Sequence, residues 1–299
     1  MKKIFFANLL FASSLFSTLI EEKPMVVVVP SYNNYKWCAS NVQSILSQDY
    51  KNFRIIYIDD KSSDETVDKV EKLIARHRIS SFHKITFDDQ KSKDILKVTN
   101  LFQKKTNENQ VFFTLVVNKN RAGALANLYR SIWSCSNEEI IVTLDGDDWF
   151  SDRNVLKRLN EIYTSGDVWL THGTMIEYPS GSQGWSEPIP PYIIENNAFR
   201  SFKCPSHLRT FYAGLFKKIN LEDLVYQGDF FSMTWDMAIM YPMIEMCAER
   251  HAFVSVPNYI YNTSNPINDN KVNAELQRTL DRLIREKPPY QRLENFIIH

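Results

Sequence analysis

The chain lacks an excess of charge of either sign, because its 35 basic residues are matched by 35 acidic ones. Proteins that bind nucleic acid usually carry a basic patch, so this balance argues against DNA or RNA as a partner. Cysteine is also scarce, and the four residues present form no CxxC pair: Cys38, Cys135, Cys204 and Cys247. Such spacing argues against a zinc site or a disulfide framework, and we expect free, buried thiols.

Linkers and repeats are missing as well. No stretch rich in Pro, Gly and Ser divides the chain, and no segment repeats, so the sequence predicts one α/β domain. We place this domain at residues 23–270 and expect a helical tail over 271–299. The polar stretch 88–110 is expected to form a solvated helix or a surface insertion.

The chain has no long uninterrupted hydrophobic run at its N-terminus. Residues 4–20 are apolar but contain Asn8 and several hydroxyl side chains, and no small-x-small cleavage site follows. A basic start followed by a short apolar run resembles a signal peptide or a weak membrane anchor. We therefore expect residues 1–22 to lie outside the domain and to direct the protein to a membrane or the secretory pathway, the cytoplasmic face included.

One short apolar run, residues 140–144, ends in three acids: Asp145, Asp147 and Asp148. Such a run fits a buried strand, and ligands of α/β sheets gather where strands end. Packed carboxylates repel each other unless a cation lies between them, and hard oxygen ligands suit Mg²⁺ or Mn²⁺. The other interpretation is a turn, or a helix cap for a segment that begins near Asn154.

Three earlier apolar runs, over residues 25–29, 53–58 and 111–117, also end in polar loops. Each is followed by apolar residues at helical spacing, which is typical of βαβ units. The third loop contains Arg121, which could meet phosphate charge, and Gly123, whose small size allows close approach of a ligand.

Four short motifs close these four strands. The first is a Pro-Ser-Tyr-Asn stretch made of Pro30, Ser31, Tyr32 and Asn33. An Asp-Asp-x-Ser-x-Asp loop spans 59–64, an Asn-x-x-Gly stretch spans 120–123, and an Asp-x-Asp stretch spans 145–147. In this order and spacing they resemble family 2 glycosyltransferases, which are inverting enzymes on the glycosyltransferase-A fold. The resemblance covers roughly residues 25–270.

The resemblance implies a role for each motif. Residues 30–33 would open the nucleotide pocket, and Asp60 would contact uracil or an equivalent base. Arg121 and Gly123 would also lie at the nucleotide, although their stretch has one residue more than the usual family spacing. Asp147 would bind Mn²⁺ or Mg²⁺ directly, and Asp145 would share in the metal site while lying nearer the ribose.

Sugar transfer also needs a base that deprotonates the acceptor hydroxyl, and a carboxylate is the usual choice. Asp236 resembles the family's catalytic aspartate, since it stands between aromatic residues and an apolar helix start. Its other interpretation is a helix N-cap. Glu245 and Asp229 are the alternative bases.

The stretch 169–209 is rich in aromatic residues, Pro and Gly, whose flat faces and fixed loops suit sugar rings. Residues 205–211 resemble a stretch that one subgroup of these transferases carries beside the acceptor pocket or the diphosphate. His207 there is a candidate third metal ligand, a diphosphate contact or a structural histidine. Arg209 is a candidate phosphate contact, because a guanidinium matches phosphate oxygens bidentately.

The sequence therefore predicts a single-domain glycosyltransferase-A fold, Rossmann-like, with a mixed, mostly parallel sheet flanked by helices. The expected activity is metal-dependent transfer from a UDP-sugar, with inversion, to a saccharide, lipid-linked or glycoprotein hydroxyl. A sugar-1-phosphate nucleotidyltransferase is the first alternative, but such enzymes usually carry a glycine-rich loop after the first strand and residues 30–33 form none. The second alternative is a non-catalytic carbohydrate-binding or scaffold protein with the same fold.

Overall fold

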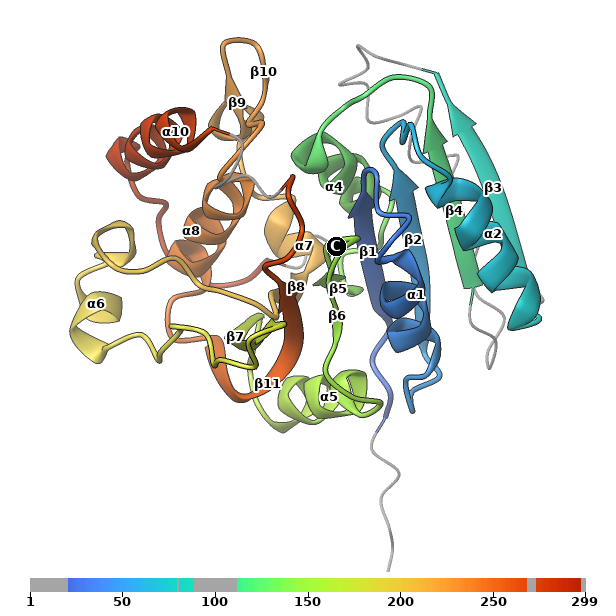
Figure 1. Cartoon of the computed structure of the whole chain (residues 1–299). Helices are drawn as coiled ribbons and strands as arrows, with labels where there is room; N and C mark the ends of the chain where they lie inside the picture. The colour runs from blue at the N-terminus through green and yellow to red at the C-terminus, as the bar shows by residue number, and fades with distance from the viewer. Residues whose placement is uncertain (1–20, 80, 89–111, 268–272, 297–299) are drawn as a thin grey trace, which may run out of the picture.

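The computed structural model of the chain describes residues 21–79, 81–88, 112–267 and 273–296 (Figure 1). Most of the expected signal or anchor and nearly all of the polar stretch 88–110 lie outside these residues. Among the helices of the described ranges, none combines the length and the apolar character that a membrane crossing requires.

Nine strands form the central sheet, in the order β3-β4-β2-β1-β5-β8-β7-β11-β6. The pairs within β3 to β5 are parallel, as is β7 with β11, whereas β8 and β6 run antiparallel to their neighbours. The strands are β1 (Met25–Ser31), β2 (Phe53–Asp59), β3 (Ser81–Phe87), β4 (Phe112–Asn118), β5 (Ile140–Thr143), β6 (Trp149–Phe150), β7 (Leu170–Tyr178), β8 (Thr210–Tyr212) and β11 (His251–Asn262). The predicted mixed, mostly parallel sheet is confirmed.

Helices cover both faces of this sheet (Figure 1). They are α1 (Cys38–Leu46), α2 (Thr66–Arg76), α4 (Ala124–Trp133), α5 (Val155–Ser165), α6 (Pro191–Glu195), α7 (Ala213–Phe216), α8 (Trp235–Cys247) and α10 (Ala274–Glu286). A small hairpin of β9 (Val225–Tyr226) and β10 (Asp229–Phe230) precedes α8.

Strand β1 is buried along its whole length because it has a packed layer on each side. Successive side chains of a strand point to opposite faces. Val26 and Val28 accordingly join one apolar cluster, with α4, α7 and α8, while Val27 and Val29 join the other, with α1 and α5. A continuous apolar run is the sequence pattern that such two-sided burial requires.

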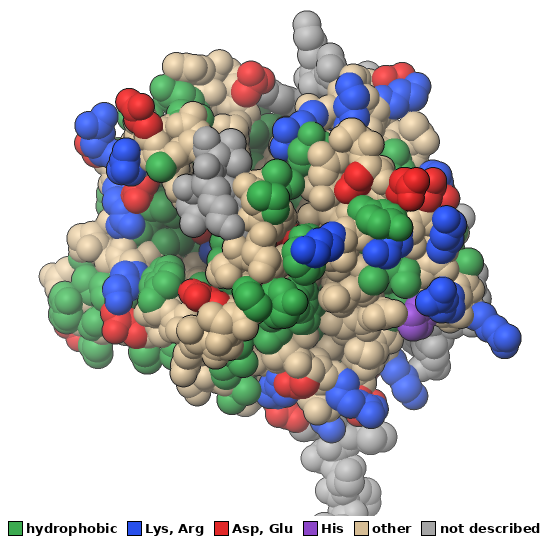
Figure 2. Space-filling model, in the orientation of Figure 1, with side chains coloured by type: hydrophobic (Ala, Val, Ile, Leu, Met, Phe, Trp, Pro, Cys, Tyr) green, Lys and Arg blue, Asp and Glu red, His purple; other side chains and the backbone are tan. Residues whose placement is uncertain are grey.

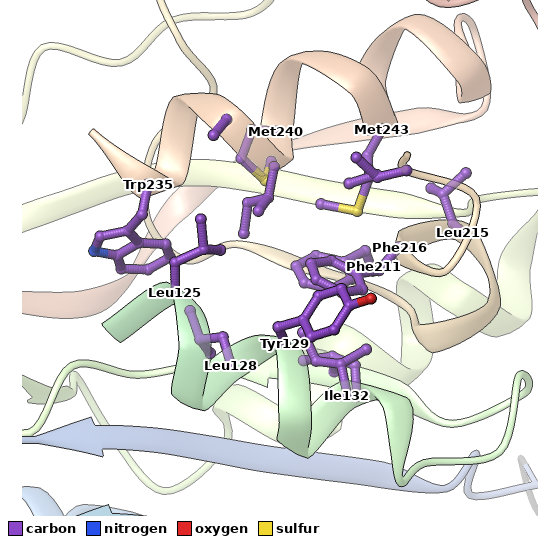
Figure 3. Close-up of a cluster of buried hydrophobic side chains, with 14 of the residues drawn as sticks. Leu125, Leu128, Tyr129, Ile132, Phe211, Leu215, Phe216, Trp235, Met240 and Met243 are labelled. Atoms are coloured by element: carbon purple, nitrogen blue, oxygen red, sulfur yellow. The ribbon is translucent and has the colours of Figure 1, made fainter. Parts of the chain in front are cut away.

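Figure 3 shows the cluster between α4 and α8. Tyr129 of α4 lies beside Phe211 of β8 and Phe216 of α7, and Met240 and Met243 reach down from α8. Of the thirteen residues of α8, all but Asp236 are buried. A helix that is apolar all round belongs inside a protein, and α8 is held on several sides at once.

A buried ion pair attaches the C-terminal part of the chain to α8. Glu245 receives hydrogen bonds from Arg200 at 2.6 and 2.9 Å and from the backbone N–H of Tyr290 at 2.9 Å. Arg200 also donates to the carbonyl of Ile284 in α10. The expected helix in the tail is present as α10, whose first turn is capped by Asn273.

Replacing Glu245 by Ala should lower the free energy of unfolding by about 3–5 kcal/mol, because it leaves the Arg200 charge buried without its partner. The side chains of Glu245 and Arg200 are only 0% and 9% exposed. Chemical denaturation of the purified protein measures this loss. Glu286→Ala is the matched control, since that carboxylate is 65% exposed, and its loss should cost less than about 1 kcal/mol.

Two local features differ from expectation. Strand β3 was not predicted, because it is an edge strand on which partly exposed and exposed residues alternate and Ile85 alone is buried. Cys204 is half-buried, unlike the other three cysteines, which are buried as expected.

Candidate active site

The four motif loops lie next to one another at one edge of the sheet. Strands β4, β2, β1 and β5 are parallel neighbours, and Ser31, Asp59 and Val117 stand opposite one another where three of them end. The carboxyl ends of parallel strands are the place where α/β proteins bind ligands. The loops that the sequence singled out are therefore brought together by the sheet.

The loops after β1 and β5 touch each other closely. The Gly146 N–H donates to the carbonyl of Pro30 at 3.0 Å, and a Cβ atom at position 146 would lie 2.6 Å from the Cβ of Ser31. Only glycine fits between the two acids of the Asp-x-Asp stretch. The Ser31 hydroxyl accepts from Tyr57 at 2.8 Å and from Asn34 at 3.1 Å, so Ser31 supports the loop from within.

Asp60 organises the loop that follows β4. One of its carboxylate oxygens accepts from the Asn118 side chain and from the N–H of Ala122, both at 2.8 Å. The other accepts from the N–H of Gly123 at 2.8 Å. Asp60 is 4% exposed, and Gly123 takes the positive φ of +87° at which α4 begins. These hydrogen bonds of Asp60 hold the loop in place. The predicted contact of Asp60 with the nucleotide's uracil or equivalent base would have to form in addition to them.

Tyr32 and Arg121 form the exposed part of the same edge. The guanidinium carbon of Arg121 lies 3.7 Å from the ring centre of Tyr32, and the Arg121 side chain is 61% exposed. Asn33, at a positive φ of 53°, fixes the turn next to them by accepting from the N–H of Ser63 at 2.8 Å. This edge therefore presents a flat ring and a positive charge to solvent, which suits a nucleotide.

Asp148 is the anchor of the acidic loop. It is 1% exposed, and its two oxygens accept from the Tyr259 hydroxyl at 2.6 Å and from the N–H of Asn262 at 2.7 Å. Burial raises the pKa of Asp148 well above its ordinary value, and the neighbouring acids Asp147 and Asp145 add to the effect. Asp148 serves to hold the loop against β11.

Asp147 is the acid best suited to a cation. The amide of Asn265 donates to one of its oxygens at 2.7 Å and orients the carboxylate. Burial raises the pKa of Asp147, and the Asn265 hydrogen bond offsets this rise only in part. A hard cation stabilises a carboxylate in such surroundings, so the residues present fit Mn²⁺ or Mg²⁺. Asp145, whose N–H donates to the Tyr259 hydroxyl at 3.2 Å, lies in the same loop.

Tyr259, Asn262 and Asn265 are the site residues that sequence reasoning missed. No role for this segment was predicted from the sequence. Each contact to the acidic loop joins residues more than 110 positions apart. No local pattern could have shown these contacts.

His207 lies behind the acidic loop with its ring stacked on Tyr259, the ring centres 4.3 Å apart. Burial, reinforced by the charge of Arg209, lowers its pKa well below the ordinary value, so the imidazole is neutral. Arg209 can only donate, and it lies 3.2 Å from Nδ1 of His207, so the ring proton sits on Nε2. Ligation through Nε2 would need the other tautomer. Across the described ranges, no three His, Cys, Asp or Glu side chains converge as a metal set.

Arg209 connects His207 to the candidate base. It is 5% exposed, and it donates to the Pro205 carbonyl at 3.1 Å and to the carboxylate of Asp236 at 2.6 Å. The side chain of Asp236 is 30% exposed, so solvent reaches it. The structure therefore brings the segment around residue 207 and the start of α8 together through one buried guanidinium.

The other interpretations of the acids are also resolved by geometry. Asp236 is not the N-cap of α8, because Thr234 occupies that position and Asp236 lies in the first turn. Glu245 is enclosed with Arg200, as described above. Asp229 is exposed on the β9–β10 hairpin. Of the three acids, Asp236 alone is joined to the acidic loop by a chain of described contacts, through Arg209, His207 and Tyr259.

Comparison with known proteins supports the resemblance. The family model described as Glycosyl transferase family 2 matches residues 26–90. An uncharacterized glycosyltransferase of Rickettsia felis is 32% identical over 73 residues, which are 24% of this chain and 12% of that protein. One of Rickettsia bellii is 27% identical over 73 residues, or 11% of its length. The match thus spans about an eighth of the curated relatives.

Several solved structures share the fold. S. aureus TarS 1–349 in complex with UDP-GlcNAc has a TM-score of 0.55 at 16% identity, over 87% of this chain and 65% of that one. The mannosyltransferase PcManGT from Pyrobaculum calidifontis, in complex with GDP-Man and Mn²⁺, has a TM-score of 0.53 at 16% identity, over 90% and 66%. Identities this low establish the architecture alone, and the predicted glycosyltransferase-A fold is confirmed.

Proposed function

Because the chain matches glycosyl transferase family 2 over residues 26–90 and has the glycosyltransferase-A fold, we propose that it transfers a sugar from a nucleotide-diphosphate donor, a UDP-sugar, to an acceptor hydroxyl. The transfer depends on Mn²⁺ or Mg²⁺ and inverts the anomeric carbon. The observation that supports this most strongly is the chain of contacts from Asp236 to the acidic loop, which joins a carboxylate base to a cation site.

The donor lies on the edge formed by the loops after β1, β2, β4 and β5. Its base is held beside Tyr32 and Asp60, and Arg121 and the Gly123 turn lie toward the phosphates. Asp147 would hold the cation, with Asp145 beside it. His207 would be a further ligand only in the tautomer that frees Nε2, which gives up the hydrogen bond from Arg209 to Nδ1. When bound, the cation neutralises the charge that develops on the departing diphosphate. Two of the solved structures that share this fold contain Mn²⁺, which supports the assignment.

The acceptor approaches from the side of α8. Asp236 takes the proton of the attacking hydroxyl, and a positioned carboxylate of this kind accelerates the step by about 10²–10⁴-fold. Arg209 holds this carboxylate in place through the 2.6 Å hydrogen bond. Arg209 was also predicted to contact phosphate. For that, its guanidinium must bind the diphosphate of the donor while it remains hydrogen-bonded to Asp236.

Release of nucleotide diphosphate from a panel of UDP- and GDP-sugars, with Mn²⁺, Mg²⁺ or EDTA, tests the proposal. We expect slow, metal-dependent hydrolysis of one donor by the full chain. Metal-dependent binding of UDP without hydrolysis would support the donor site and show that the acceptor is needed for turnover. A protein that neither binds UDP nor hydrolyses any donor would be a non-catalytic member of the fold.

Replacing Arg121 by Ala should weaken UDP binding by about tenfold, because the charge-assisted contact to phosphate and the stacking on Tyr32 are both lost. The side chain is 61% exposed and its ion pair with Asp60 is long, at 4.0 Å, so its removal should leave the core intact. Titration calorimetry with UDP and Mn²⁺ measures the change. Arg153→Ala, which removes a 69% exposed arginine elsewhere, is the control and should bind UDP like the parent. Equal affinities in the two variants would remove Arg121 from the site.

The proposed membrane or secretory location rests on residues 1–22. Glu22 lies at the edge of the domain, where its carboxylate accepts hydrogen bonds from the N–H groups of Lys51 and Asn52 at 3.1 and 3.0 Å. A chain that begins at residue 21 therefore keeps these contacts. Fractionation of cells that express the full chain or this shortened chain tests the location. Recovery of both proteins in the same fraction would contradict it.

A further inference from the structure

A hollow beside the candidate active site lies between β7 and the segments around residues 186 and 204. We call it the Trp185 pocket, and it is lined by His172, Trp185, Ser186, Cys204 and Ser206, among others. It contains about 200 Å³ of open space, counted to its mouth. The enclosed part of this space is only about 10 Å³, which is room for one water-sized group, and the remainder is open to solvent. The buried His172 lies at its floor and the exposed Trp185 at its mouth.

The floor of the Trp185 pocket carries two polar atoms without a described partner. His172 is 1% exposed and its Nε2 makes no hydrogen bond, and the same is true of the buried hydroxyl of Ser186. Buried polar atoms are nearly always hydrogen-bonded, and an orphaned one is costly. The floor is therefore built for a small polar group that enters from the mouth, whether water or part of a ligand.

The floor is uncharged. Burial, with a contribution from His251, lowers the pKa of His172 to about 3, so its imidazole is neutral at pH 7. A neutral imidazole has one N–H and one lone pair, and a serine hydroxyl also both donates and accepts. This combination matches another hydroxyl group. It offers no positive charge for a carboxylate or a phosphate.

The mouth is formed by an aromatic face. The Trp185 ring is 51% exposed, and the ammonium group of Lys203 lies 5.9 Å from its centre. Lys203 is in turn paired with Glu187 at 3.0 Å, so the rim is close to neutral. An exposed tryptophan beside a polar floor suits a ligand with an apolar face and a hydroxyl edge, which are the two features of a sugar ring.

The Trp185 pocket lies next to the candidate base. Ser206, which lines it, directly precedes His207. Pro205, which also lines it, accepts a hydrogen bond from Arg209 at 3.1 Å, and Arg209 donates to Asp236 at 2.6 Å. The nucleotide edge at Tyr32 belongs to loops on the other half of the sheet. A ligand in the pocket would therefore be on the acceptor side of the reaction.

We propose that the Trp185 pocket binds one sugar residue of a neutral saccharide acceptor, with the ring on Trp185 and one hydroxyl between His172 Nε2 and Ser186 Oγ. This inference rests on the proposed function, since the transfer requires an acceptor and Asp236 must lie near it. It selects a saccharide from the three classes of acceptor that the sequence left open. It also makes Trp185 and Ser186 specificity-determining residues.

Saturation-transfer NMR of the full chain with a panel of methyl hexosides and methyl N-acetylhexosaminides tests the proposal. At least one glycoside should bind, and Trp185→Ala should weaken it by about tenfold or more, as loss of a stacking face does. Ser186→Ala should weaken it by a smaller factor. Tyr192→Ala is the matched control, because Tyr192 is 60% exposed on α6 and does not line the pocket. Figure 2 shows hydrophobic side chains gathered at the edge of the molecule where α6 lies.

Binding of UDP with Mn²⁺ to the same samples separates the two proposals. Trp185→Ala should retain it, which also shows that the variant is folded. Failure of every glycoside to bind the parent protein, or equal binding by Trp185→Ala, would overturn the pocket assignment whatever UDP does. Glycoside binding without UDP binding would instead overturn the donor site and leave the saccharide pocket standing.

Discussion

Replacing Asp147 by Asn is expected to abolish metal-dependent sugar transfer, with a fall in kcat/KM of about 10³-fold or more, the scale on which loss of a transition-state charge contact acts. The amide keeps the shape of the side chain and a partner for Asn265, but it removes the negative charge that holds the cation. Without the cation, the diphosphate leaves with its charge uncompensated. The loss should therefore appear in the chemical step and in metal affinity together.

Manganese binding, followed by electron paramagnetic resonance, and donor turnover measure the two effects in the same preparation. Asp49→Asn is the control, because that carboxylate is 57% exposed and makes only a 3.8 Å ion pair with Arg153. It should bind manganese and turn over like the parent protein. Unchanged sugar transfer by Asp147→Asn would contradict the assignment of Asp147 as a metal ligand.

Replacing Asp236 by Asn is expected to lower kcat by about 10²–10⁴-fold, the usual contribution of a general base. Metal-dependent UDP binding should remain, because Asp236 lies on α8 and the donor loops lie at the ends of β1, β2, β4 and β5. The asparagine carbonyl can still accept from Arg209, so the guanidinium keeps a hydrogen bond while losing its counter-charge. Some loss of stability is expected for this reason.

The alternative base provides the control. Asp229→Asn changes an exposed acid on the β9–β10 hairpin, and its kcat should stay within about twofold of the parent value if Asp236 is the base. Thermal unfolding of both variants shows whether a loss of activity is a loss of folded protein. If Asp236→Asn is active, Asp236 is not the base. If Asp229→Asn is folded but inactive, Asp229 is the better candidate.

These variants test a site whose two halves have different origins. The acidic loop and the loops after β1, β2 and β4 belong to consecutive strand–helix units. The candidate base, its arginine and the Trp185 pocket come from the segment 169–209 and from α8. The hydrogen bond from Arg209 to Asp236 links the two halves, because Arg209 also contacts His207, whose ring stacks on Tyr259 beside the acidic loop.

The sequence by itself determined the α/β class, the mostly parallel sheet and the edge at which the four motif loops meet. Its reason is local: a continuous apolar run must be buried on both faces, and parallel strands place their ends together. The edge strand β3 was missed because its half-exposed residues alternate and no apolar run marks it. Asp236 was chosen as an acid in apolar surroundings, and it is the one residue of α8 that is not buried; its interpretation as a possible N-cap was wrong.

Only the tertiary structure decided what each polar side chain touches. Asn265 reaches Asp147 across 118 positions and Tyr259 reaches Asp148 across 111, so no window of sequence contains both partners. Arg209 and Asp236 are only 27 positions apart, yet no local pattern indicates their contact, and the same is true of the two orphaned polar atoms of the Trp185 pocket. Secondary structure follows from spacing along the chain, whereas a site is made by side chains that the packing of distant elements brings within hydrogen-bond distance.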